Sequence, residues 1–170
     1  AACVEYLPRT STNGVRFVSL LGGLTRKFSA NPHDVIHRLA ERTGAEAYVM
    51  PVPFFANTVE DRNILFSQRG VREIFDLAAG ADLLMVGIGT AEREASLVAT
   101  GMIEKGEIEE VKRAGGVGEV LGHFFDARGK PVETTLSDRT FTLGREQLSN
   151  RRIVAVAGGK IKLPALKAVL

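Results

Sequence analysis

Four short apolar runs, each leading into a glycine- or proline-rich turn, alternate with helix-like segments along the 170 residues. The clearest run, DLLMVGI at residues 82–88, is apolar at nearly every position, as in a central parallel strand covered on both faces. The other runs lie at residues 15–21, 47–50 and 153–157. Strands that alternate with helices predict an α/β fold, built on a mostly parallel sheet flanked by helices.

Helix signals separate these runs. Residues 31–43 begin with Asn-Pro, which suits a helix start, and the TVED of residues 58–61 resembles a capping box. Further helices are expected at residues 71–79 and 107–114. The segment EVLGHFFDARGKPVETT predicts a β-hairpin that turns at residues 126–129.

The composition limits the classes of protein and of site. The net charge is +2, with acidic and basic residues interspersed, which excludes a dedicated nucleic-acid surface of clustered Lys and Arg. Cys3 is the only cysteine, so the chain forms no internal disulfide and no thiolate metal cage. No apolar run approaches the roughly 20 residues of a membrane span. These features favour the reducing cytoplasm and no membrane partner.

Both ends resemble interruptions of a longer chain. The first segment, AACVEYLPRT, lacks an initiator Met and a capping residue, and the last, LPALKAVL, lacks a C-capping glycine. The sequence contains no internal repeat, low-complexity tract or interdomain linker. Residues 1–170 are therefore expected to form a single domain that is truncated at both ends.

The turns GGLT, PVPFF, GIGT and AGGK follow the four predicted strands. In open α/β sheets, ligands bind outside the carboxyl ends of the strands, where backbone N–H groups are free. Glycine lets the backbone approach a ligand closely, although strand–helix turns also contain glycine for steric reasons alone. The sequence therefore predicts a ligand crevice at this edge, with the candidate glycines Gly22, Gly23, Gly87, Gly89, Gly158 and Gly159.

Several familiar sites do not occur in the sequence. The turn GIGTAE has only the first two glycines of G-x-G-x-x-G, and there is no Walker A motif or G-x-S-x-G elbow. His33 and His37 stand four apart but lack the H-E-x-x-H arrangement of a zinc site. No metal, cofactor or catalytic residue is predicted. A small polar or anionic molecule, held by backbone amides, a lysine and a carboxylate, fits best.

Four motifs, in a specific order and spacing, are ADLLMVGIGT, GGVGEVLGHFFDARGKPV, LSDRTFTL and VAVAGGKIKLPALKAVL. Together they resemble the effector-binding domain of SorC/DeoR-type bacterial transcriptional regulators, also called the sugar-binding domain family. The resemblance implies a Rossmann-like domain similar to sugar-phosphate isomerases and glucosamine-phosphate deaminases, with the β-hairpin as an insertion. It also implies a sugar, polyol or sugar-phosphate effector, which controls operator DNA binding by a separate N-terminal helix-turn-helix domain that this sequence does not contain.

The resemblance also implies roles for single residues. Lys162 matches the basic residue of the family's AGG-x-x-K turn, which implies a contact to a phosphate or sugar oxygen; the alternative is an exposed lysine. Glu119 matches an acidic residue that contacts ligand hydroxyls, and the alternative is a solvated strand-edge glutamate. Asp138, in the Ser-Asp-Arg that replaces the family's Asn-Asp-Arg, either contacts the ligand or orders its turn. Phe54 and Phe55 are expected in the core, with one of them roofing the crevice.

Two functions compete: a sensor without catalysis, and a sugar-phosphate isomerase or deaminase. Glu119 and Lys162 could supply the base and the carbonyl-activating group that an isomerase needs. A dimerisation module that has lost its ligand is a third alternative. The match of all four motifs favours the regulator, and therefore no enzyme. Such regulators read two-fold symmetric operators, so a homodimer or homotetramer is expected.

Overall fold

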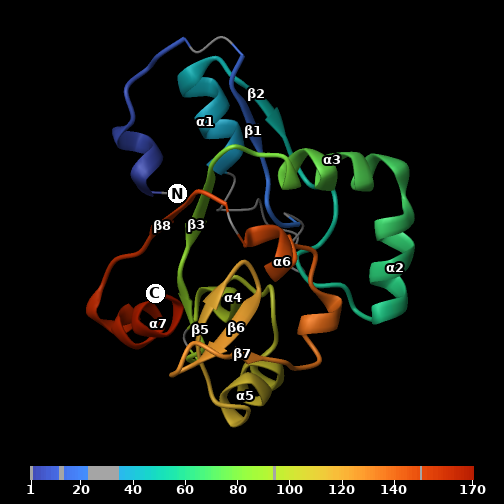
Figure 1. Cartoon of the computed structure of the whole chain (residues 1–170), viewed down its shortest axis with the longest axis vertical. Coiled ribbons are helices and arrows are strands. Elements are labelled where there is room, and N and C mark those ends of the chain that lie inside the picture. Colours follow the sequence, from blue (N-terminus) through green and yellow to red (C-terminus); the bar gives the residue numbers. More distant parts are fainter. Residues whose placement is uncertain (1, 12–13, 23–34, 94, 150) are drawn as a thin grey trace.

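The computed structural model describes residues 2–11, 14–22, 35–93, 95–149 and 151–170 (Figure 1). Gly23 and His33, together with the predicted helix start at Asn31 and Pro32, lie outside the described residues.

Helices and strands follow one another along most of the described chain. In chain order the elements are η1 (Ala2–Tyr6), β1 (Arg16–Val18), α1 (Val35–Thr43), β2 (Glu46–Tyr48), α2 (Val59–Ser67), α3 (Arg69–Ala79), β3 (Leu84–Gly87), β4 (Gly89–Thr90), α4 (Ser96–Ala99), α5 (Lys105–Arg113), β5 (Gly116–Val120), β6 (His123–Asp126), β7 (Pro131–Val132), η2 (Ser137–Arg139), α6 (Arg145–Leu148), β8 (Ile153–Val156), η3 (Lys160–Lys162) and α7 (Leu163–Val169).

The described strands form three small sheets. β1 pairs with β2, and β3 with β8, both in parallel, whereas β4, β5, β6 and β7 form an antiparallel sheet in that order. Figure 1 shows β3 and β8 running between the β1–β2 pair at one end of the molecule and the antiparallel sheet with α5 at the other. The α/β class is confirmed. The predicted single, mostly parallel sheet is not seen in the described residues: the parallel pairs are separate, and after β3 the chain enters β4, which pairs antiparallel with β5.

The predicted β-hairpin is confirmed, and its turn is held by one side chain. Asp126 Oδ1 accepts hydrogen bonds from the backbone N–H groups of Arg128 and Lys130, both at 2.8 Å. The N–H of Gly129 donates to the carbonyl of Asp126 at 3.0 Å. An aspartate that bonds to backbone groups just beyond it is a standard turn former.

Two details differ from the sequence predictions. The helix predicted at residues 107–114 begins earlier, as α5, because the side chain of Glu107 accepts a hydrogen bond from the N–H of Glu104 at 2.7 Å and so caps the helix start. Strand β3 is not covered on both faces by the described residues. Leu84 and Val86 are buried, but 61% of Met85 is exposed.

Two hydrophobic clusters form the core. One contains Ile108 and Val111 of α5 and Phe124 of β6, and therefore joins this helix to the antiparallel sheet. The other contains Phe75 of α3 and Leu84 of β3, and joins that helix to the parallel pair. None of the helices in the described part of the chain has the length and apolar character that a membrane span requires.

Helix α7 packs closely on β5 at a glycine. A Cβ atom added to Gly118 would lie 3.0 Å from both Cα and Cβ of Ala165, which is fully buried in α7. Pro164 lies in the first turn of this helix, as the sequence predicts. The close packing places the start of α7, with Lys162, next to the strand that carries Glu119.

Substitution of Gly118 should therefore loosen this packing. Gly118→Val is expected to lower the free energy of unfolding by about 1–3 kcal/mol, because the backbone of α7 must move to admit the side chain. Gly87→Val is the matched control, since a Cβ at this exposed strand position meets no atom within 4 Å. Urea unfolding of both variants checks the prediction, and equal losses in the two would contradict it.

Candidate functional site

The carboxyl ends of β3 and β8 meet because these strands are parallel neighbours. The register pairs Gly87 with Val156 at their last residues. Lys162, in η3, is half-buried and donates a hydrogen bond from Nζ to the carbonyl oxygen of Ile88 at 2.7 Å. The lysine thus ties the turn that follows β8 to the turn that follows β3.

Glu119 lies buried at the same place, on β5. Only 8% of the residue is exposed, and its Oε1 accepts a hydrogen bond from the backbone N–H of Gly122 at 2.5 Å. Gly89 of β4 is its partner across the antiparallel pair. A Cβ atom at position 89 would overlap the Oε2 of Glu119, so the glycine leaves the space that the carboxylate occupies.

Burial controls the protonation of Glu119. Desolvation raises the pKa of its carboxyl to about 7 and outweighs the Gly122 N–H and the Lys162 ammonium, which both lower the pKa. The carboxyl group therefore changes charge near neutral pH.

The turn between β5 and β6 supports the carboxylate from one side. Leu121 and Gly122 both have positive φ, 52° and 80°, as in the two-residue turns that suit a hairpin. The ring of Phe54 and the methyl group of Thr140 lie against Gly122, where an added Cβ would approach them to 3.1 and 2.6 Å. The Gly122 N–H that binds Glu119 is therefore held by packing on its other side.

The candidate glycines serve different purposes. A Cβ at Gly22 would collide with the backbone of Pro53, so the steric explanation fits this residue, as it does Gly89. Gly159 has φ +99°, a conformation that favours glycine. Gly87 and Gly158 are exposed, with open space beside them.

The structure brings together Glu119, Gly89 and Lys162. Phe54 is linked to them indirectly, because it packs on Gly122, whose N–H binds Glu119. Phe54 is 3% exposed and belongs to the core, as predicted. Asp138 lies exposed in η2 and takes no part in the hydrogen bonds that hold Glu119 or Lys162. Its contact with a ligand stays a prediction. Within the described ranges, no three His, Cys, Asp or Glu side chains gather as metal ligands would.

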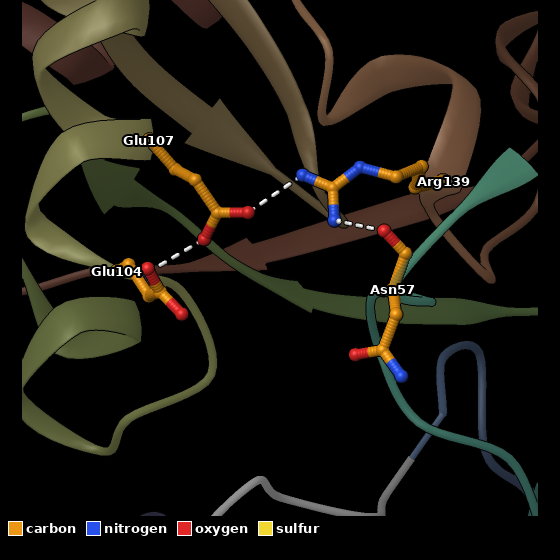
Figure 2. Close-up of a pocket in the computed structure, with 4 residues that line it drawn as sticks. All are labelled: Asn57, Glu104, Glu107 and Arg139. Atoms are coloured by element: carbon orange, nitrogen blue, oxygen red, sulfur yellow. Dashed lines mark hydrogen bonds and ion pairs between the residues drawn. The ribbon is translucent and has the colours of Figure 1, made fainter.

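A separate polar cleft lies beside α5 and is lined by Asn57, Glu104, Glu107 and Arg139 (Figure 2). Figure 2 shows the guanidinium of Arg139 between the carboxylate of Glu107 and the backbone carbonyl of Asn57. None of these four residues belongs to the Glu119–Lys162 site. Arg139 was not singled out by its sequence pattern, although it stands next to Asp138 in the LSDRTFTL motif.

The raised pKa makes the stability of the protein depend on pH. Folded Glu119 holds its proton up to about pH 7, whereas the unfolded chain loses it near 4.5, so the free energy of unfolding should fall as pH rises between these values. The loss amounts to about 3 kcal/mol above pH 7. Urea unfolding at a series of pH values checks this, with Glu119→Gln as the control that lacks the titration. Parallel pH curves for the two proteins would contradict it.

Comparison with known proteins identifies the family. The model of the "Putative sugar-binding domain" family matches residues 1–170. The erythritol catabolism regulatory protein EryD of Brucella abortus is 59% identical over 170 residues, which are 100% of this chain and 54% of that protein. The transcriptional regulator LsrR of Klebsiella pneumoniae is 35% identical over 174 residues, 99% of this chain and 52% of that protein. The chain thus spans about half the length of these relatives.

Solved structures show the same fold. The full-length sorbitol operon regulator SorC from Klebsiella pneumoniae matches with a TM-score of 0.84 at 24% identity, over 97% of this chain and 55% of that chain. A DeoR family transcriptional regulator from Listeria monocytogenes matches with a TM-score of 0.86 at 22% identity, over 98% and 67%. The chain belongs to the family of sugar-binding domains found in SorC/DeoR-type transcriptional regulators.

Proposed function

We propose that this domain senses a small sugar or polyol and controls DNA binding by a separate domain of a transcriptional regulator. The observation that carries the proposal is the buried Glu119 carboxylate beside Lys162, at the carboxyl ends of β3 and β8. Ligands of open α/β folds bind at such strand ends. The proposed ligand-binding residues are this pair together with Phe54, Asp138 and the candidate glycines.

The polar groups of the site suit a hydroxyl-bearing ligand. Glu119 uses Oε1 for Gly122, which leaves Oε2 as an acceptor, and Lys162 gives one of its three N–H donors to Ile88. A ligand hydroxyl both donates and accepts, so it satisfies a carboxylate and an ammonium at once. The relative EryD is named for erythritol catabolism. We therefore propose a neutral polyol of this kind, with a sugar phosphate on Lys162 as the alternative.

The finer fold is also part of the proposal. We infer that β1–β2 and β3–β8 belong to one Rossmann-like sheet, similar to that of sugar-phosphate isomerases and glucosamine-phosphate deaminases. Met85, Val154 and Val156 on this pair are apolar but exposed by 61%, 45% and 42%. Parallel sheets are normally covered on both faces, so we infer that further elements pack on the β3–β8 pair. Residues 1–170 then act as one effector-binding domain, in a cytoplasmic protein that forms a homodimer or homotetramer to read a symmetric operator.

Substitutions of the two lysines test the site. Lys162→Ala should weaken erythritol binding about ten- to a hundredfold, because a hydrogen bond to a charged group contributes roughly 1.5–3 kcal/mol. Lys160→Ala is the matched control, since Lys160 lies exposed in the same turn. Glu119→Gln should also weaken binding, since the amide offers one acceptor oxygen in place of two. Calorimetry measures the affinities, and equal effects of Lys160→Ala and Lys162→Ala would contradict the assignment.

The competing enzyme hypothesis predicts turnover. We expect none, because all the relatives named above are regulatory proteins. Incubation of the protein with phosphorylated aldoses and ketoses, followed by NMR, should leave each substrate unchanged. Isomerisation that the Glu119→Gln variant lacks would establish the enzyme in place of the sensor.

A further inference from the structure

All three nitrogen atoms of the Arg139 guanidinium donate hydrogen bonds. Nε donates to the carbonyl of Thr135 at 3.0 Å, and Nη1 to the carbonyls of Ala56 at 2.8 Å and Asn57 at 3.2 Å. Nη2 forms an ion pair with Glu107 Oε1 at 2.6 Å (Figure 2). The Arg139 side chain is 12% exposed and that of Glu107 is 16% exposed. We call these contacts the Arg139 clasp.

The backbone continues the same connection. The N–H of Ala56 donates to the carbonyl of Arg139 at 2.8 Å, and the N–H of Phe141 donates to the carbonyl of Phe54 at 2.8 Å. Two segments that lie far apart in the sequence are thus paired side by side, with the clasp at one end. The clasp adds two hydrogen bonds between these segments, to the carbonyls of Ala56 and Asn57, beside the two backbone hydrogen bonds of the pairing itself.

Each of the two paired segments has, within two residues of a clasp contact, a residue that packs beside the Glu119 site. Thr140 follows Arg139 directly, and Phe54 stands two residues before Ala56. Their side chains are the ones that lie against Gly122. We therefore expect a shift of either segment to move the N–H group that binds Glu119.

We propose that Arg139 is a positioning residue of the effector site, which fixes the carboxylate of Glu119 through the segments that pack on Gly122. It does not touch the ligand. Its part in sugar binding rests on the function proposed above, but its action on Glu119 does not.

The titration of Glu119 tests this action without any ligand. The intact protein is labelled with 13C at the glutamate carboxyl carbons, and the Glu119 signal is assigned by its loss in Glu119→Gln. In Arg139→Gln the pKa of Glu119 should fall from about 7 toward 4.5, because water reaches the carboxyl. The loss of burial outweighs the loss of the Gly122 hydrogen bond, which alone would raise the pKa, since burial is the largest cause of the shift. Arg145→Gln is the matched control: it breaks the exposed ion pair with Glu133 and should leave this pKa unchanged.

A milder variant keeps the test decisive if Arg139→Gln does not fold. Arg139→Lys retains the charge opposite Glu107 but loses the planar fork that reaches three carbonyl groups. It should give a pKa of Glu119 between those of the wild type and of an exposed carboxyl. A wild-type pKa of Glu119 in folded Arg139→Lys overturns the proposal.

Binding of erythritol gives the second readout. Arg139→Lys should weaken it about tenfold, a size typical of residues that act through others. In the Glu119→Gln background the same change should have no further effect, because the group it positions is gone. Fully additive losses would show that Arg139 acts independently of Glu119 and would overturn the proposal. If the wild-type protein does not bind erythritol, the polyol function fails, while the titration still decides the role of Arg139.

Discussion

The hydrogen bond from the Gly122 N–H to the buried Glu119 is the interaction around which this region is built. It holds a tight turn with two positive φ values in place and leaves one carboxylate oxygen for another partner. Space for the carboxylate depends on Gly89, and the approach of Lys162 depends on the packing of α7 on Gly118. The chemistry of the site therefore follows from close backbone packing at glycine, and from the desolvation that this packing produces.

The sequence predicted those parts of the fold that have local signals. Apolar runs marked the strands, and the Asp126 turn marked the hairpin, because each depends on residues that are neighbours in the chain. The sequence did not predict β4, the first strand of the antiparallel sheet. The pairing of Gly89 with Glu119 joins residues that lie 30 positions apart, and no local pattern indicates that residues 89–90 leave the parallel pair to join β5.

Prediction of the site had a similar limit. Glu119 and Lys162 came from the resemblance to a family, and the structure then placed both at one point, with the glutamate buried and not solvated as the alternative had it. Arg139 stood in one of the family motifs but had no pattern of its own. Its partners Ala56 and Glu107 lie 83 and 32 residues away, and only the folded chain brings their oxygen atoms to one guanidinium group.

The overlap between a side chain at position 89 and the carboxylate of Glu119 has an evolutionary consequence. The two positions share one volume, so a larger residue at position 89 requires the carboxylate of Glu119 to move from its present place. A lineage that replaces Gly89 must therefore move or shorten the side chain at position 119, which accepts the Gly122 hydrogen bond and which we propose as an acceptor for the ligand. Gly89 is therefore expected to persist for as long as a glutamate does at position 119, and to become free to vary once a smaller residue takes its place.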